Sequence, residues 1–280
     1  MTAFIQGAVG SWQITKFDSN TNLHLIAANR KKLPVLIQEQ NSFPGLTNRK
    51  LAKNAKKVCV AYDGMEKYFR DDQIVLTGNP VRSDIKELSS KRQVGLEYFN
   101  FVPGIKTILV LGGSLGARTI NESMIENLEM MKEADIQVIW QTGKFYYEEM
   151  VERAGFSKDH GILITQFIDK MDMAYAAADL AISRAGALSI SELCIAGLPV
   201  IFVPSPNVAE DHQTKNAMSL VDLNAANMVK DSDAREKMVK QALDLLVDDA
   251  KRDSLSANIK GLAKPEATKE IVEQLKMIMN

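Results

Sequence analysis

The chain has 280 residues, of which 46% are hydrophobic and 25% are charged, so it can build folded cores and is long enough for about two domains. Its formal net charge of −1 gives no indication of nucleic-acid binding. The two cysteines, Cys59 and Cys194, form no CxxC pair, which argues against a disulfide framework or a zinc site and points to the reducing cytoplasm. No apolar run reaches the roughly 18 residues of a membrane-spanning helix, and residues 1–12 do not resemble a signal peptide.

Short apolar runs alternate with amphipathic stretches from Leu33 onward. The apolar runs predict strands at residues 34–38, 57–62, 74–78, 107–112, 137–142, 162–167, 180–183, 199–204 and 227–230. Helical spacing of apolar residues predicts helices at residues 121–132, 146–154, 212–223 and 233–247. This alternation is typical of an α/β fold with doubly wound parallel sheets, whose sites lie outside the carboxyl ends of the strands.

The chain divides into two predicted units. The stretch 83–103 is polar and then loosely aromatic, and it turns at Pro103-Gly104, so it predicts a link. We expect residues 1–83 to form a first Rossmann-like domain that is incomplete, because residues 1–22 show no clear alternation and a doubly wound domain usually needs more chain. Residues 84–264 have the full alternation of a second Rossmann-like domain, and residues 265–280 form a helical tail.

A Gly-rich corner follows the predicted strand 107–112. Gly112, Gly113, Ser114 and Gly116 lie where this strand gives way to a helix. Glycines let a ligand approach the backbone, and the N–H groups of a helix N-terminus favour a phosphate. A plain strand–helix turn is the alternative. The spacing is not G-x-G-x-x-G, and the next strand ends at residues 141–143 without a carboxylate, so the sequence does not predict a nicotinamide site.

A second corner of small residues follows the predicted strand 180–183. Ser189 and Ser191 lie near the N-terminus of a short helix, where a phosphate or a sugar could meet backbone N–H groups. Glu192 follows in the first turns of this helix. A carboxylate would be repelled by a pyrophosphate, but it can accept from both hydroxyls of a ribose. The alternative is a capping box in which Glu192 reaches back to Ser189.

Other polar residues also follow predicted strands. Gln213 and Asn216 share one helix face and suit sugar hydroxyls. Phe167 and Ile168 could flank a base, although core packing is the commoner role of such a pair. We predict no metal site, because the D-x-D at residues 231–233 sits at a helix start where capping explains it and the histidines lack ligand spacing.

The first unit carries its own polar run, which includes Glu39 and Asn41. Arg82 lies at the junction between the units, where its side chain could reach into a cleft. Residues 30–57 contain eight Lys or Arg against one acid, Glu39. This basic face could meet an anionic lipid or a pyrophosphate, or it could simply be a solvated helix face.

Several motifs together resemble a known family. They are, in chain order, QEQNSFPGLTNRKLA, TGNPVR, GGSLGAR, FIDKM, SRAGALSISELCIAGLPVIFVP and DHQTKNA. In this order they resemble the MurG family, which are bacterial UDP-GlcNAc:lipid I N-acetylglucosaminyltransferases of the two-domain GT-B type. The likeness runs from about Leu25 to the C-terminus. It implies inverting transfer of GlcNAc to the C4 hydroxyl of lipid I, an undecaprenyl-linked acceptor, to give lipid II without a cofactor. It also implies a peripheral place on the anionic cytoplasmic face of the cell membrane and no nucleic-acid partner.

The resemblance implies roles for individual residues. The implied UDP-GlcNAc-binding residues are Asn41, Arg82, Ser114, Ile168, Ala187, Leu188, Ser189, Ile190, Ser191, Glu192 and Gln213, with Gly112, Gly113 and Gly116 as the phosphate loop. Ile168 would lie beside the uracil, Glu192 on the ribose and Gln213 on the sugar hydroxyls. Glu39 matches a family acid near the reaction centre, but the general base stays unassigned.

Two departures qualify the resemblance. The Gly-rich strand–loop–helix with a histidine that opens the family, and its second Gly-rich loop, have no match here, so we expect a truncated acceptor-side domain. Leu115 stands where many relatives have Gln.

We expect residues 266–279 to pack back on the first domain as in the family, with Ile271, Leu275 and Ile278 as the apolar face. The alternatives are a non-catalytic or partner-dependent UDP-GlcNAc-binding protein and an enzyme like UDP-GlcNAc 2-epimerase.

Overall fold

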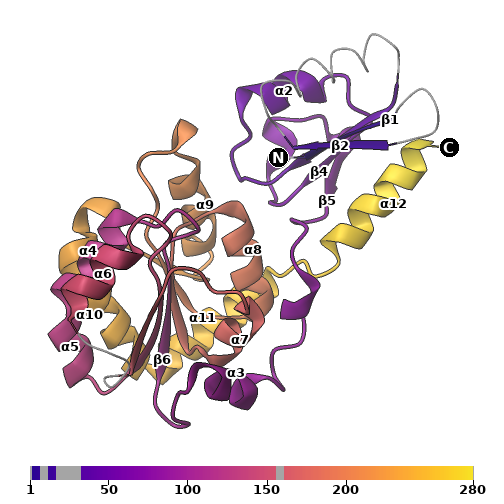
Figure 1. Cartoon of the computed structure of the whole chain (residues 1–280). Helices are drawn as coiled ribbons and strands as arrows, with labels where there is room; N and C mark the ends of the chain where they lie inside the picture. The colour runs from indigo at the N-terminus through magenta and orange to yellow at the C-terminus, as the bar shows by residue number, and fades with distance from the viewer. Residues whose placement is uncertain (1, 7–11, 17–32, 156–160, 280) are drawn as a thin grey trace. The chain divides into compact units, whose positions relative to one another are not determined.

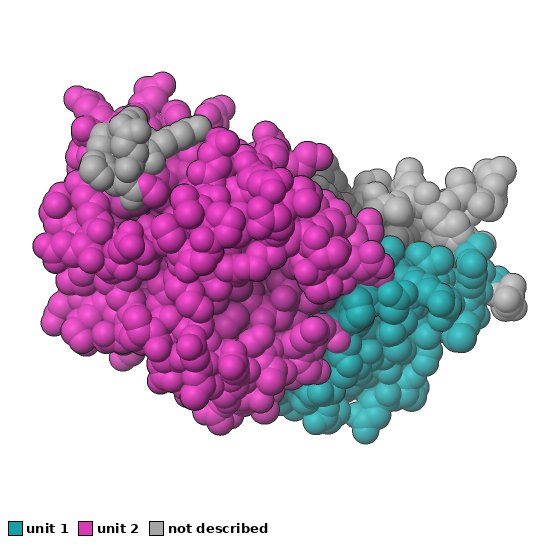
Figure 2. Space-filling model, turned by 90° about the horizontal axis from the view of Figure 1, so that it is seen from below, with its two compact units in different colours: residues 1–81, 264–280 teal, residues 82–263 magenta. Residues whose placement is uncertain are grey.

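A computed structural model describes residues 2–6, 12–16, 33–155 and 161–279. The chain forms two compact units, which Figure 2 shows in different colours. Unit 1 comprises Met1–Val81 together with Lys264–Asn280, and unit 2 comprises Arg82–Ala263. Among the described residues, no helix combines the length and the apolar character needed to cross a bilayer.

Unit 2 is built on a six-stranded parallel sheet (Figure 1). Its strands are β6 (Thr107–Leu111), β7 (Gln137–Gln141), β8 (Ile162–Thr165), β9 (Leu180–Ser183), β10 (Val200–Phe202) and β11 (Asn227–Met228). Their order is β11-β10-β9-β6-β7-β8, so the chain winds outward in one direction from β6 and then in the other from β9. This is the order of a doubly wound Rossmann-like sheet, and it confirms the predicted α/β class.

Helices cover both faces of this sheet. They are α3 (Arg92–Phe99), α4 (Arg118–Glu126), α5 (Leu128–Glu133), α6 (Tyr147–Ala154), α7 (Met171–Ala177), α8 (Ala187–Ala196), α9 (His212–Val221), α10 (Ala234–Val247) and α11 (Asp249–Gly261). Strand residues such as Ile108, Val110 and Trp140 pack against α4, α6 and α10 in one buried cluster. Every residue of β6, β7 and β9 is buried, which is why these strands read as continuous apolar runs in the sequence.

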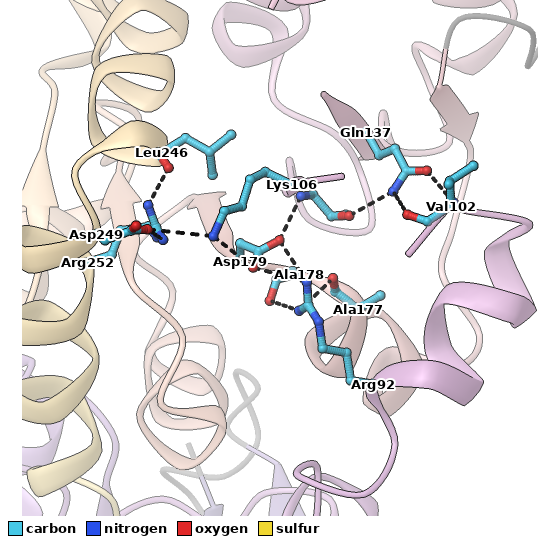
Figure 3. Close-up of polar contacts among 11 residues, drawn as sticks. Arg92, Val102, Lys106, Gln137, Ala177, Ala178, Asp179, Leu246, Asp249 and Arg252 are labelled. Carbon is cyan, nitrogen blue, oxygen red and sulfur yellow. Dashed lines mark hydrogen bonds and ion pairs between the residues drawn. The ribbon is translucent and has the colours of Figure 1, made fainter. Parts of the chain in front are cut away.

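Helix α3 lies inside residues 83–103, which the sequence predicts as a link. Its Arg92 donates to both carboxylate oxygens of Asp179 at 3.1 and 3.0 Å and to the carbonyl of Ala177 at 3.2 Å (Figure 3). Asp179 also accepts from the backbone N–H of Thr107 at 2.8 Å. Since Thr107 begins β6 and Asp179 immediately precedes β9, these bonds fasten α3 to the amino ends of both strands. Residues 92–99 are therefore part of unit 2 and not a free linker.

Unit 1 has a smaller, mixed sheet in the order β2-β1-β3-β4-β5. Strands β3 (Val35–Glu39), β4 (Lys57–Val60) and β5 (Ile74–Leu76) are parallel, as the sequence predicted. Strand β1 (Thr2–Gln6) runs antiparallel to β3 and to β2 (Trp12–Lys16). This antiparallel pair was not predicted, because its segment carries no clear alternation of polar and apolar residues.

The described residues of unit 1 include the α-helices α2 (Leu46–Ala52) and α12 (Ala267–Met279). Helix α12 lies against β3 and β4, where Ile271 joins the buried Leu36 and Cys59. Leu275 and Ile278 pack at the edge of the same cluster. Burial raises the pKa of the Cys59 thiol to about 12, so this side chain is a neutral part of the core.

Candidate functional site

A cavity of about 570 Å³ opens at the carboxyl ends of β6 and β9 in unit 2. These strands are the neighbours between which the winding direction reverses, the place where doubly wound sheets bind ligands. The residues that line it are Arg82, Leu111, Gly112, Gly113, Ser114, Leu115, Gly116, Ala117, Arg118, Thr119, Gln141, Tyr146, Phe167, Ile168, Met171, Tyr175, Ser183, Arg184, Gly186, Ser189, Glu192, Ser205, Pro206, Asn207, Gln213 and Asp231.

The corner between β6 and α4 is shaped by backbone contacts. Gly116 has a φ of +89°, and a Cβ there would lie 2.3 Å from the carbonyl oxygen of Thr142 and 2.5 Å from the ring of Tyr146. The N–H of Gly116 donates to the carbonyl of Gly113 at 3.1 Å, which closes the loop. Within the described part of the chain no side chain caps the N-terminus of α4, so its first N–H groups border the cavity without an acceptor from a cap. This corner can therefore hold an anion through main-chain N–H groups.

The corner between β9 and α8 presents side chains instead. Helix α8 begins after Gly186, also without a cap from any described side chain. One carboxylate oxygen of Glu192 accepts from Nε of Arg82 at 3.2 Å, and the other accepts from the hydroxyl of Tyr175 at 2.9 Å. The carboxylate of Glu192 thus lines the cavity and bonds Arg82 and Tyr175. It does not reach back to Ser189 as a capping box would require. A negatively charged acceptor in this position suits ligand hydroxyls.

A charged bridge joins the two corners. The guanidinium of Arg184 contacts the carboxylate of Asp231 at 2.5 Å and donates to the carbonyl of Val203 at 2.9 Å. The other oxygen of Asp231 accepts from the hydroxyl of Thr119, in the first turn of α4, at 2.9 Å. The sequence predicts a helix cap at Asp231, but the side chain of this residue bridges the two corners instead. The sequence motifs do not predict a site role for Arg184 or Thr119. Arg184 directly follows the predicted strand 180–183, and Thr119 follows the predicted strand 107–112 after one loop.

Ile168 and Gln213 also line the cavity, and each makes a hydrogen bond within the protein. The backbone N–H of Ile168 donates to Oε1 of Gln141 at 3.1 Å, and the Ile168 side chain is buried. Phe167 beside it is exposed, so an apolar ring is available at the rim. Oε1 of Gln213 accepts from the N–H of Ser205 at 2.9 Å, which fixes the orientation of its amide.

Four of the predicted donor-binding residues on α8, residues 187, 188, 190 and 191, do not line the cavity. Ile190 is buried in the packing of α8, and Leu188 is exposed. The hydroxyl of Ser191 donates to the carbonyl of Ala187, one turn earlier, at 3.0 Å. Ser189 and Glu192 are the members of this helix that line the cavity.

Glu39 and Asn41 belong to unit 1 and lie at the end of β3. Glu39 is fully buried, and it accepts from the backbone N–H of Asn41 at 3.0 Å and from the side chain of Asn48. Burial raises the pKa of Glu39 against the opposing effect of these hydrogen bonds. The carboxyl group of Glu39 is inaccessible to solvent and accepts from two amide donors. These hydrogen bonds fix the loop that carries Asn41. We therefore do not assign Glu39 as a base.

Comparison with known proteins identifies the family. Residues 107–275 match the glycosyltransferase family 28 C-terminal domain. A protein of Parabacteroides distasonis named UDP-N-acetylglucosamine–N-acetylmuramyl-(pentapeptide) pyrophosphoryl-undecaprenol N-acetylglucosamine transferase is 52% identical over 248 residues, which are 89% of this chain and 67% of the relative. The chain belongs to the MurG family of glycosyltransferases. A relative of the same name from Cytophaga hutchinsonii is also 52% identical, over 91% of this chain and 68% of its own length.

Solved structures agree with this membership. The crystal structure of Acinetobacter baumannii MurG superposes with a TM-score of 0.69 at 29% identity, over 93% of this chain and 72% of that one. A UDP-GlcNAc 2-epimerase from Neisseria meningitidis gives a TM-score of 0.64 at 15% identity, over 93% and 74%. At that identity the likeness to the epimerase concerns the fold alone. The chain spans about two thirds of the length of the MurG relatives that it matches.

Proposed function

We propose that this chain transfers N-acetylglucosamine from UDP-GlcNAc to the C4 hydroxyl of lipid I, with inversion at the anomeric carbon, to give lipid II and UDP. The observation that carries this proposal is the cavity at the ends of β6 and β9. There, two helix N-termini without caps from described side chains and the carboxylate of Glu192 line one space, in a chain of the MurG family.

The two corners suit the two polar parts of a nucleotide diphosphate. The N–H groups at the start of α4 and α8 would bind the diphosphate, with the Ser114 hydroxyl and Arg82 beside it. Glu192 would accept from the ribose hydroxyls, and the uracil would lie beside Ile168. As the bond between the sugar C1 and the diphosphate breaks, negative charge grows on UDP, and prearranged N–H donors stabilise that charge.

The acceptor side of the reaction requires a base. The C4 hydroxyl of lipid I attacks C1 on the face opposite to the leaving UDP, and its proton must pass to a basic group. We leave this group unassigned, because Glu39 is buried and accepts hydrogen bonds from Asn41 and Asn48. The roles of Gln213 and Asn41 in holding the sugar remain predictions from the resemblance.

We also propose a peripheral association with the anionic cytoplasmic surface of the cell membrane. Exposed lysines on and just after α2, Lys50 and Lys53, support it, since each basic residue near an anionic surface contributes about 1 kcal/mol. Arg30, Lys31 and Lys32 of the predicted basic face lie outside the described residues. Binding to vesicles with and without anionic lipid, compared between the wild type and K50E/K53E, tests this part separately.

The transferase proposal is tested with the purified chain, UDP-GlcNAc and lipid I. We expect lipid II and UDP in equal amounts, with Glu192→Gln reduced and Glu129→Gln, whose side chain is 80% exposed on α5, unchanged. Conversion of UDP-GlcNAc without an acceptor would instead identify an epimerase-like enzyme. Calorimetric binding of UDP without any turnover would identify a binding protein that needs a partner.

A further inference from the structure

Tyr175 contacts the candidate ribose-binding carboxylate directly. It lies on α7, its side chain is only 3% exposed, and its hydroxyl donates to one oxygen of Glu192 at 2.9 Å. Arg82 holds the other oxygen at 3.2 Å. Each oxygen of this carboxylate is thus fixed by a different donor, one neutral and buried, the other charged and partly exposed. Neither the sequence motifs nor the family resemblance singled out Tyr175.

We propose that Tyr175 is a positioning residue that orients Glu192 toward the ribose and thereby sets the preference of the cavity for ribonucleotides over 2′-deoxyribonucleotides. A carboxylate has about four lone-pair sites, so the bonds from Tyr175 and Arg82 leave one on each oxygen for a ligand hydroxyl. Fixing the plane of the carboxylate points these remaining sites in one direction. The inference rests on the proposed function, because it assumes that UDP occupies the cavity.

Close packing between helices fixes the position of Tyr175. Its helix α7 packs closely on α3, where a Cβ on Gly95 would lie 2.6 Å from the carbonyl oxygen of Met173. Lys91, which immediately precedes α3, forms an ion pair of 2.8 Å with Asp172 of α7. Burial and the adjacent carboxylate of Glu192 raise the pKa of Tyr175 well above its ordinary value of 10.0. The hydroxyl therefore keeps its proton at neutral pH and acts only as a donor to Glu192.

The surroundings of Tyr175 decide which substitution tests its role. Tyr175 borders the donor cavity and also a second cavity of about 520 Å³, which is lined by residues of α3, α7, α8 and α11. A truncation to Ala would open one cavity into the other and confuse packing with positioning. Tyr175→Phe keeps the ring and removes only the hydroxyl. Tyr98→Phe, on a side chain that is 52% exposed on α3, is the matched control in the same unit.

The experiment measures the affinities of UDP and 2′-deoxy-UDP by calorimetry. In the wild type we expect UDP to bind about tenfold more tightly than 2′-deoxy-UDP, the effect of one hydrogen bond to a charged group. Tyr175→Phe should reduce this ratio to about twofold or less, mainly by weakening UDP, while Tyr98→Phe keeps the wild-type ratio. In a Glu192→Gln background the effect of Tyr175→Phe should vanish, because there is no longer a carboxylate to orient.

The double substitution separates positioning from a general loosening of the fold. If Tyr175→Phe weakened both nucleotides equally, or had the same effect in the wild-type and Glu192→Gln backgrounds, its hydroxyl would serve stability and our inference would be wrong. A wild-type ribose preference that survives Tyr175→Phe would also overturn it, while leaving the donor site intact. Absence of UDP binding to the wild type would overturn the proposed function together with the inference.

Discussion

The two corners of the donor cavity are built in different ways. Between β6 and α4 the chain is shaped by Gly113 and Gly116, which have positive φ, and Gly116 also lies against the backbone of Thr142. A main-chain hydrogen bond between these two glycines closes the loop. Between β9 and α8 the connection is surrounded by polar side chains that bond one another or nearby carbonyls, namely Arg82, Tyr175, Arg184 and Glu192.

This difference matches what each corner would recognise. A phosphate presents several equivalent oxygens, and a ring of main-chain N–H groups can meet them without a specific side chain. A ribose presents two hydroxyls in a fixed direction, which requires an acceptor with a defined orientation. The first corner should therefore be sensitive to changes of backbone shape, and the second to changes of single polar atoms.

The largest effect should come from Gly116→Ala. At a φ of +89°, with the new Cβ 2.3 Å from a carbonyl oxygen, the substitution combines backbone strain with a clash that the rigid loop cannot relieve. We expect the free energy of unfolding of unit 2 to fall by about 3 kcal/mol. Gly113→Ala is the control, because its φ is also positive but a Cβ there meets no described atom within 4 Å, and it should cost only about 1 kcal/mol. Urea unfolding measures both, and equal losses would contradict the importance of the close contact.

A smaller effect is expected for Asp231→Asn, which acts on the bridge between the corners. It removes the charge that faces Arg184, whose side chain is only 15% exposed, and should lower the free energy of unfolding by about 2 kcal/mol. Asp244→Asn is the matched control, since its ion pair with Lys240 is largely solvated and should leave stability unchanged within error. Thermal unfolding of the two variants decides the matter; a similar small loss in both would show that the bridge is not structural.

Side-chain removal at each corner sharpens the comparison further. Ser114→Ala should weaken UDP binding only about threefold, because main-chain donors would remain in place around the diphosphate. Glu192→Gln should weaken it about tenfold, since no backbone group replaces the carboxylate. Calorimetry at one temperature and salt concentration measures both affinities. The reverse order would mean that the serine hydroxyl, and not the N–H groups, dominates the first corner.

The smallest expected effect is a pH dependence of the free energy of unfolding caused by Glu39, the buried carboxylate of unit 1. It contrasts with Glu192, which lines the cavity. Burial raises the folded-state pKa of Glu39 above its ordinary value of 4.5, so the charged form is disfavoured in the folded chain. Its contribution to stability should therefore fall as the pH rises from 4.5 through the raised pKa. Thermal unfolding of the wild type and Glu39→Gln between about pH 5 and 8 should show this slope only in the wild type.

Another carboxylate supplies an internal reference for that experiment. The hydrogen bond from Arg153 holds the pKa of Glu122 below its ordinary value of 4.5. The stabilisation from Glu122 is complete above that value and is lost as the pH falls toward the depressed pKa. The two residues therefore act on opposite sides of pH 4.5. A slope above this pH that persists in Glu39→Gln would mean that another group causes it.

Much of unit 2 could be predicted from the sequence. Its strands are buried on both faces, so they appear as uninterrupted apolar runs, and the glycines at residues 112, 113 and 116 mark the first corner directly. The α/β class, the Gly-rich corner and the position of Glu192 after β9 followed from such local signals. The apolar spacing of α3 is less regular, so the sequence predicts a link at residues 92–99 instead of a helix.

The partners of the polar residues could not be predicted in the same way. Tyr175 and Glu192 are 17 positions apart, and Arg184 and Asp231 are 47 apart. Nothing in the spacing of either pair suggests contact, because the contact arises from the order of strands in the sheet. For the same reason the local sequence predicts only a cap at Asp231, and it does not predict the hydrogen bond from Asn48 to the buried Glu39.

The contribution of α12 to unit 1 has a consequence for how the protein matures on the ribosome. Unit 2 is encoded by one uninterrupted stretch, so it can fold as soon as that stretch has emerged. The apolar surface of β3 and β4 around Leu36 and Cys59 is translated before unit 2, but it is covered by Ile271 only after all of unit 2 has been made. During that interval the nascent chain carries an unshielded hydrophobic surface, and such surfaces promote aggregation of partly folded chains.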